Sequence, residues 1–302
     1  MGFLDYTDCR NLGQKISIFI LAFVLFSCGN SDKPLDNATS GEINIACDYS
    51  FEPLTKALIN VFESDYPRAK INLLVTTELN ALRLLKIDSV QLIIVGSEPD
   101  TSLIAYFKNK KKRIEFTPLA YDGLALVTNP KSAYTKLNVN QLKGFLRDSI
   151  NETKLVIDKG NSSNYNFLKN WMLPDSVKNQ IFSATDFDEM VSYLLVSPNA
   201  IGVIGSSLIS EDMNPKVQKY LNQIAVVSIL NDSTGEETYP FPDYFARNVY
   251  PLERKINLVF NANYFGLAKG FASFAAGPKG QRIVLKFGLL PDRMPSRDLK
   301  IK

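Results

Sequence analysis

The amino-acid sequence predicts an α/β protein with two lobes, each a mostly parallel sheet flanked by helices. Its 302 residues exceed the roughly 150 that one domain usually holds, so two compact units are expected. Short apolar segments of strand length alternate with longer amphipathic segments of helix length, as in βαβ units. Two apolar strands, one in the middle of the chain and one nearer its C-terminal end, are placed to connect the two lobes.

The first half of the chain begins with a βαβ unit. A helix starts at Pro53, in the position that proline favours in a first helical turn, and it runs to about Ser64. The strands expected around it are 43–46, 70–76 and 90–95, and the further helices are 81–87 and 102–109. Because ligands of such sheets bind at the carboxyl ends of the strands, we expect a site at that edge.

A long apolar segment at 116–128, interrupted by Asp122 and Gly123, predicts the strand that leaves the first lobe for the second. In the second lobe we expect helices at 140–146, 164–172 and 187–195, and strands at 154–157 and 201–204. Residues 255–260 predict the return strand, and the last helices lie within 264–285. We therefore assign lobe 1 to residues 42–118 plus 247–302, and lobe 2 to residues 119–246.

The N-terminus carries a candidate export signal. An apolar run of about a dozen residues, 16–27, is shorter than the roughly 20 that a spanning helix needs. It ends in Leu25-Phe26-Ser27-Cys28, which resembles the lipobox of bacterial lipoproteins and implies removal of a signal peptide, 1–27, and lipidation of Cys28. Residues 28–41 predict a flexible tether. An uncleaved short anchor and a buried strand are the alternatives for the apolar run.

Composition excludes much of catalytic and metal chemistry. The chain has no histidine, and its three cysteines are too few for a four-thiolate metal site. Of these, Cys47 is expected to be a small buried hydrophobe. We expect no catalytic residue, no metal and no cofactor. The net charge of +3 gives no strong field, and we expect the basic run 108–113 to be solvated, so nucleic acid is not an expected partner.

Several fragments, taken in order, carry a resemblance to a known family. They are residues 119–130 (LAYDGLALVTNP), 199–205 (NAIGVIG), 250–252 (YPL), 277–281 (GPKGQ) and 287–291 (FGLLP). Together they resemble the phosphate-binding branch of the periplasmic substrate-binding proteins that serve ABC importers. The resemblance covers nearly the whole mature chain. It implies the two-lobed periplasmic-binding-protein-like (type II) fold with two hinge crossovers.

The resemblance also implies a binding site between the lobes. The family holds its oxyanion with loop N–H groups, hydroxyls and helix N-termini, which attract negative charge. The matching positions are Ser50, Phe51, Thr76, Thr77, Gln91, Ser97, Asn161, Ser162 and Ser163. Hydroxyl and amide residues before helices are also ordinary N-caps, so each loop has a purely structural alternative.

Two positions depart from the family pattern. Gln91 stands where the family has an acidic residue that accepts a proton of the ligand, although Asp88 is close by. Ile157 stands where the family has an arginine, and Lys159 is the nearest cation that could replace it. A lysine is a point charge rather than a bidentate fork, so phosphate binding is expected to be weakened or the ligand to differ.

The function expected from this resemblance is that of an extracytoplasmic solute-binding lipoprotein. It would capture phosphate or a related small oxyanion for an ABC-type importer, with the permease or another envelope protein as partner and the membrane reached through the lipid anchor. It would lie in the periplasm or cell envelope. The alternative is a degenerate binding-protein fold that acts as an envelope sensor or assembly partner without phosphate transport. An enzyme that uses carboxylate chemistry is the least expected class, because no nucleophile and base pair is visible.

Overall fold

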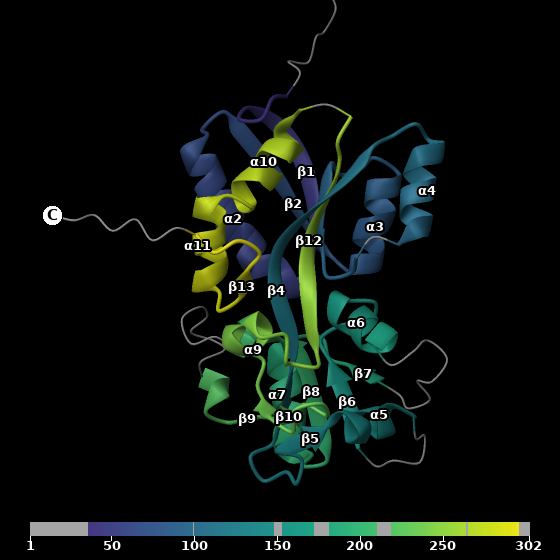
Figure 1. Ribbon diagram of the computed structural model, residues 1–302, viewed down its shortest axis with the longest axis vertical. Coiled ribbons are helices and arrows are strands. Elements are labelled where there is room, and N and C mark those ends of the chain that lie inside the picture. The colour runs from purple at the N-terminus through teal and green to yellow at the C-terminus, as the bar shows by residue number, and fades with distance from the viewer. Residues whose placement is uncertain are drawn as a thin grey trace, which may run out of the picture. The chain divides into compact units, whose positions relative to one another are not determined.

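A long mixed sheet runs through the computed structural model, which describes residues 36–98, 100–147, 153–171, 181–209, 219–263 and 265–295 (Figure 1). Its strands are β1 (Gly41–Asp48), β2 (Ala69–Thr76), β3 (Leu92–Val95), β4 (Ile114–Thr128), β6 (Lys154–Ile157), β7 (Ile181–Ser183), β8 (Ala200–Gly205), β9 (Ala225–Val226), β12 (Glu253–Asn261) and β13 (Leu290–Pro291). Their order is β2-β1-β3-β12-β4-β8-β6-β7, with β9 and β13 also paired to β4. The proposed signal peptide and Cys28 lie outside the described residues.

Helices cover both faces of this sheet. They are η1 (Tyr49–Phe51), α2 (Glu52–Asp65), α3 (Glu78–Lys86), α4 (Thr101–Asn109), α5 (Val139–Arg147), α6 (Ser163–Trp171), α7 (Phe187–Val196), η2 (Ser206–Ile209), α9 (Pro242–Ala246), α10 (Leu267–Ala275) and α11 (Pro278–Lys286). The strands β5 (Lys136–Asn138), β10 (Ser228–Leu230) and β11 (Glu237–Thr238) form a second, small sheet. Within the described residues, none of these helices combines the length and apolarity needed to cross a bilayer.

Lobe 1 consists of β1, β2 and β3 in parallel, with β12 antiparallel to β3. Its strands alternate their side chains between two cores, as a period of two requires. In β1, Ile45 and Cys47 face the core under α2, α10 and α11, whereas Ala46 faces the core under α3 and α4. Figure 1 shows these two helix groups on opposite sides of the strands. Cys47 is fully buried, which confirms its expected role as a small core residue.

Lobe 2 repeats this arrangement around β8, which pairs in parallel with β6 and antiparallel with β4. In β4, Leu124 and Leu126 face a core that includes residues of α5 and α6, while Ala125 and Val127 face α7. The predicted α/β class with parallel-rich sheets is therefore confirmed. The lobes are not two separate sheets, however, because β4 and β12 join them into one.

The strand β4 passes from one lobe to the other later than predicted. It pairs with β12 up to Gly123 and with β8 from Leu124, so the change of partner falls about five residues after the predicted boundary at 118. At this point a carbon added at Gly123 would lie 2.8 Å from the Phe245 ring, so only glycine fits. The long strand thus forms a continuous connection between the lobes.

The last residues of the predicted tether, 28–41, contact lobe 1. The Asp36 carboxylate accepts a hydrogen bond from the Leu267 N–H at the start of α10, at 2.7 Å. Ala38 lies so close to Gly270 that a side chain there would collide with the Ala38 carbonyl. Residues 36–41 are therefore attached to lobe 1. The polar composition suggested a linker, but these residues satisfy a helix N-terminus and begin the first strand.

Candidate functional site

The carboxyl ends of β1, β2 and β6 bring three of the predicted loops to one edge. Asp48, the last residue of β1, occupies the centre of this cluster and is fully buried. Its Oδ2 accepts hydrogen bonds from the N–H groups of Glu78 at 2.8 Å and Ser163 at 3.0 Å, which belong to the first residues of α3 and α6. One carboxylate therefore binds helix N-termini from both lobes, which is an anion-binding arrangement with a resident anion.

A second carboxylate, that of Glu78, fills the neighbouring space. Its Oε2 accepts hydrogen bonds from the N–H groups of Gly96 at 2.8 Å and Ser97 at 3.3 Å, and from the Ser163 hydroxyl. The Ser163 hydroxyl in turn accepts the Gly96 N–H at 2.8 Å. Glu78 is 2% exposed. The hydroxyl and N–H groups that the family resemblance assigned to a ligand are thus engaged by the chain's own carboxylates.

Asp158, directly after β6, is the third acid of this cluster. It accepts hydrogen bonds from Ser162 Oγ at 3.0 Å, Asn164 Nδ2 at 3.0 Å and Ser50 Oγ at 3.3 Å. The last of these bonds joins the two lobes. Burial raises the pKa of Asp158. Asp158 follows Ile157, the position where the resemblance implied an arginine, so the charge next to that position is negative rather than positive.

Burial is also the main cause that raises the pKa of Asp48, to about 6. The hydrogen bonds from Ser50 lower this pKa, while the charges of Glu78 and Asp158 raise it. Three carboxylates from β1, α3 and the β6 end therefore lie at one lobe junction. We call Asp48, Glu78 and Asp158 the acid cluster.

Eight of the nine predicted site residues lie at or near this edge in different roles. Ser50, Ser97, Ser162 and Ser163 contact the acid cluster, as described above. Thr76 accepts a hydrogen bond from Asn80 Nδ2 and Thr77 caps the N-terminus of α3, so both have local structural roles. Phe51 is buried beneath the Arg254 guanidinium, 5.0 Å from its ring centroid, and Asn161 is an exposed residue with φ of 59°.

Gln91 is not at this edge, which corrects its prediction. It precedes β3, and its Oε1 accepts the Asn44 N–H at 2.8 Å, so it lies at the amino end of that strand. Gly96 and Ser97, which directly follow the carboxyl end of β3, contact the acid cluster instead. Asp88 forms an ion pair with Lys112, and Lys159 Nζ lies 4.0 Å from the Tyr49 ring centroid, so neither replaces the missing groups.

Sequence reasoning missed the acid cluster. Glu78 stands in the first turn of α3 behind two threonines, where a carboxylate usually complements the helix dipole on the surface. Asp48 likewise fits the N-cap of η1, whose Ser50 N–H and hydroxyl it does bind. The available signal was the clustering of acids with hydroxyls at three equivalent strand ends.

A buried ion pair connects the strands that join the lobes. Arg254 of β12 donates from Nη2 to Asp122 Oδ2 at 2.7 Å and from Nε at 3.2 Å, and both side chains are at most 2% exposed. Asp122 Oδ1 accepts the N–H groups of Gly123 and Ser206. Arg254 Nη1 is buried without a hydrogen-bond partner among the described residues. The pair orders the junction and leaves one donor free.

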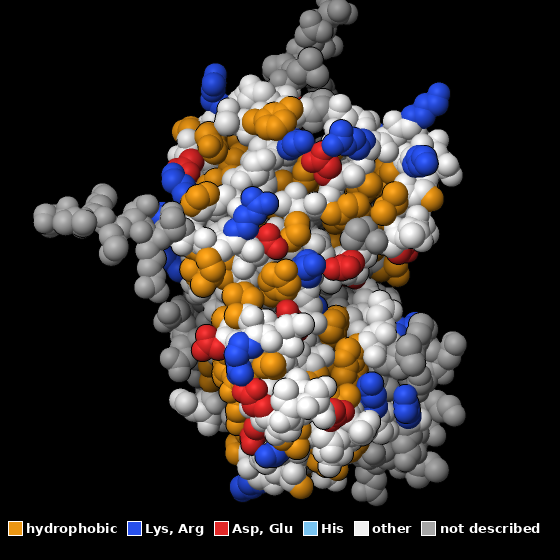
Figure 2. All heavy atoms as spheres, viewed as in Figure 1, with side chains coloured by type: hydrophobic (Ala, Val, Ile, Leu, Met, Phe, Trp, Pro, Cys, Tyr) orange, Lys and Arg blue, Asp and Glu red, His pale blue; other side chains and the backbone are white. Residues whose placement is uncertain are grey.

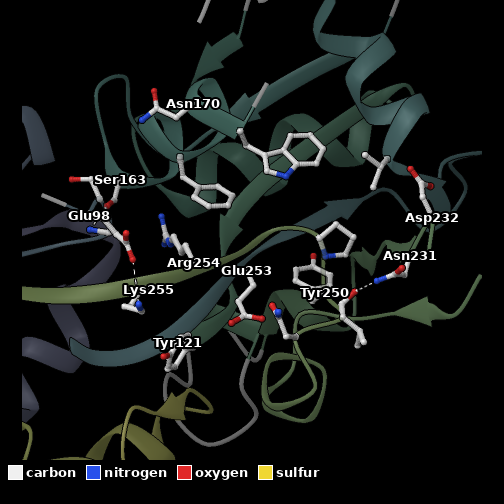
Figure 3. Close-up of a pocket in the computed structure, with 18 of the residues that line it drawn as sticks. Glu98, Tyr121, Ser163, Asn170, Asn231, Asp232, Tyr250, Glu253, Arg254 and Lys255 are labelled. Atoms are coloured by element: carbon white, nitrogen blue, oxygen red, sulfur yellow. Dashed lines mark hydrogen bonds and ion pairs between the residues drawn. The ribbon is translucent and has the colours of Figure 1, made fainter. Parts of the chain in front are cut away.

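Beside this pair, a cavity of about 820 Å³ opens between the lobes (Figure 3). Its aromatic lining residues are Tyr121, Phe167, Trp171 and Tyr250, and its charged ones are Glu78, Glu98, Asp232, Glu253, Arg254 and Lys255. Figure 3 shows Asn170 of α6 across the cavity from Tyr121 and Lys255, with Glu98 bonded to Lys255. The volume lies in the range of small-molecule sites, roughly 300–1,000 Å³.

Glu253 supplies a further unused polar atom to this cavity. Its Oε2 is buried without a hydrogen-bond partner in the described part of the chain, and burial raises its pKa to about 7. Like Arg254 Nη1, it is a buried polar atom without a hydrogen-bond partner within the described residues, in a residue that lines the cavity. Groups of this kind are costly to bury unless something binds them, so they mark a candidate ligand site.

Comparisons with known proteins agree with this two-lobed geometry. A family model described as a PBP superfamily domain matches residues 33–279. No curated protein matches the chain by sequence.

Solved structures match it by fold. A putative phosphate ABC transporter substrate-binding protein with bound phosphate from Clostridium perfringens has a TM-score of 0.67 at 17% identity, over 84% of this chain and all of that one. An ABC-type phosphate transport receptor from Vibrio cholerae gives 0.65 at 16% identity, over 83% and 100%. The CcmR regulatory domain of Synechocystis PCC6803, in complex with 2-PG, gives 0.55 at 12%, over 85% and 100%.

Proposed function

Since the chain belongs to the PBP superfamily, we propose that it is an extracytoplasmic solute-binding protein whose ligand lies in the cavity between its lobes. The observation that carries this proposal is the cavity itself, because residues of both lobes and of the joining strands line it. Such a site is completed only when the lobes come together, so ligand binding and lobe closure are coupled. The protein acts as a binder and not as an enzyme.

The cellular setting is part of the same proposal. A signal peptide, 1–27, is removed, and Cys28 carries the lipid that anchors the protein in the cell envelope. The partner is the membrane permease of an ABC-type importer or another envelope protein. The solved relatives that are named as parts of phosphate ABC transport systems support the importer. Labelling with a fatty acid analogue, lost in Cys28→Ala, tests the anchor.

Phosphate or a related small oxyanion is the ligand class that those relatives support. Two features of this chain oppose it. The N–H groups of Glu78, Gly96, Ser97 and Ser163 already bind carboxylates of the acid cluster. The cavity lining holds four carboxylates against two cations, and one phosphate would fill only a small part of its volume. We therefore propose a larger organic solute with both donor and acceptor groups, which Glu253 Oε2 and Arg254 Nη1 would bind.

The only tryptophan of the sequence, Trp171, lines the cavity and gives a direct test. The protein from Gly29 onward is used, because it includes both lobes in full. It is titrated with phosphate, sulfate, amino acids, sugars and polyamines while the tryptophan fluorescence is followed. The proposal predicts a saturable change with at least one organic solute, lost in Trp171→Phe, and confirmed by heat of binding for both variants. A folded protein that binds none of these contradicts it.

A sensor or assembly role without a small solute is the second candidate. It is favoured by one observation, the hydrogen bonds that join the lobes through the chain's own acid cluster, including Ser163 N to Asp48 Oδ2 and Ser50 Oγ to Asp158 Oδ2. Crosslinking in intact cells distinguishes the two. A partner captured equally with and without added solute supports this role, whereas capture that depends on a solute supports the importer.

A further inference from the structure

We propose that Glu78 is a built-in occupant of an oxyanion site between the lobes and the residue that excludes free oxyanions from this protein. The inference rests on the proposed function in one respect: it takes the cleft between the lobes as the solute site. It adds which ligands that site rejects, and it names the side chain responsible.

The groups around Glu78 form the donor set of an anion site. They come from one stretch of lobe 1 and one of lobe 2: the N–H groups of Gly96 and Ser97 after β3, and the Ser163 hydroxyl at the start of α6. Asn166 Nδ2 approaches the other carboxylate oxygen at 3.4 Å. N–H groups and hydroxyls that converge from separate loops bind a free anion in the same way.

Although Glu78 borders the cavity, its carboxylate and the donors that bind it are packed directly against each other. The Glu78 side chain is 2% exposed, and Ser163 is 1% exposed. A single carbon added at Gly96 would lie 2.5 Å from Ser163 Oγ and 3.3 Å from the Phe51 ring. A free oxyanion can therefore use these donors only if the Glu78 carboxylate leaves them.

The surrounding charges add to this exclusion. Asp48 and Asp158 lie at the same junction, and the charges of Glu78 and Asp158 raise the pKa of Asp48. The nearest guanidinium, that of Arg254, is already paired with Asp122. A dianion such as phosphate would be repelled by the acids, whereas a monoanionic carboxylate would only replace the charge that Glu78 supplies.

The experiment replaces Glu78 and supplies the lost carboxylate from solution. In Glu78→Ala, acetate and formate are expected to bind saturably, at least tenfold tighter than to wild type, and to raise the melting temperature of the variant alone. Phosphate is expected to bind the variant more weakly than acetate. Calorimetric titration and thermal unfolding, both with chloride held constant, measure these effects.

Three matched variants identify the site. Glu98→Ala removes an exposed carboxylate from the rim of the same cavity and is expected to create no acetate binding. Glu78→Gln keeps an oxygen acceptor in place and is expected to leave the site filled. Ser163→Ala in the Glu78→Ala background removes one donor and is expected to weaken acetate binding. If Glu78→Ala unfolds alone, acetate must restore its folding, as circular dichroism would show.

Two results would overturn the inference. One is a folded Glu78→Ala protein that is indifferent to acetate and formate, or an unfolded one that acetate fails to rescue. The other is wild type that binds phosphate or acetate as tightly as the variant does. Both leave the proposed solute-binding role standing, since the fluorescence titration with organic solutes judges that role separately.

Discussion

At the scale of single residues, the decisive feature is a set of buried carboxylates where an anion was expected. Seryl and N–H donors can be recognised from sequence because they precede helices. The sequence does not reveal whether a ligand or a neighbouring side chain accepts their hydrogen bonds. That depends on contacts between residues such as Asp48 and Ser163, which are 115 positions apart. The hydrogen-bond donors of the loops were therefore predictable, whereas the groups that accept their hydrogen bonds were not.

Asp48 makes the stability of the protein depend on pH. Its pKa is about 6 in the folded protein against an ordinary 3.8, so the folded state keeps a proton that the unfolded chain releases. Stability should therefore fall as pH rises from 4.5 to 7, by on the order of 2 kcal/mol from this group. Urea unfolding at several pH values measures it. In Asp48→Asn the fall should be smaller, and an unchanged slope would show that another group titrates.

Gly96 is the residue where a side chain would separate the lobes. A methyl group there would lie 2.5 Å from Ser163 Oγ, so Gly96→Ala should cost about 1–3 kcal/mol of unfolding free energy. Gly144 in α5 is the control, because nothing lies within 4 Å of its added carbon, and alanine there should stabilise the helix by up to about 1 kcal/mol. Equal effects of both substitutions in chemical denaturation would contradict the close contact.

At the scale of elements, prediction succeeded where a segment was long enough to show its period. The segments expected at 70–76, 102–109 and 187–195 correspond closely to β2, α4 and α7. The strands β5, β7, β10 and β11 have two or three residues each, too few for any alternation to be visible. Gln91 was aligned to the opening of β3, and it lies at the amino end of that strand, whereas the acid cluster lies at the carboxyl end.

The start of α6 is stabilised by the side chain of Ser162. Ser162 Oγ accepts the Tyr165 N–H at 3.2 Å and donates to Asp158, so it caps the helix. Ser162→Ala should cost about 1 kcal/mol. Ser102→Ala, at an exposed serine of α4, should change stability by less than about 0.5 kcal/mol. Thermal unfolding compares them, and no loss in Ser162→Ala would mean that the cap contributes nothing.

At the scale of the whole molecule, two strands connect the lobes. Their apolar composition was predictable from the sequence, although their pairing was not.

The surface charges are dispersed. Figure 2 shows basic and acidic side chains interspersed over the face seen there. In the basic run, Lys112 pairs with Asp88 and Arg113 with Glu115. This face offers no broad basic surface to a polyanion.

The buried pair of Asp122 and Arg254 should dominate the stability of the lobe junction. Arg254→Met leaves a buried carboxylate without its cation, a change that typically costs about 3–5 kcal/mol. Lys255→Met removes the next cation on the same strand, whose partner Glu98 is 70% exposed, and should cost less than about 1 kcal/mol. Denaturant unfolding of both variants measures the contrast, and similar losses would contradict the assigned role of the pair.

The central claim is that the two lobes meet over the chain's own carboxylates, so the solute of this protein is not free phosphate. Calorimetric titration of the wild-type protein from Gly29 onward with phosphate at pH 7 tests it most directly, with circular dichroism to establish that the sample is folded. We predict no saturable heat up to millimolar phosphate. Micromolar binding, equivalent to about −8 kcal/mol, would contradict the claim and show that Glu78 yields its place to the ligand.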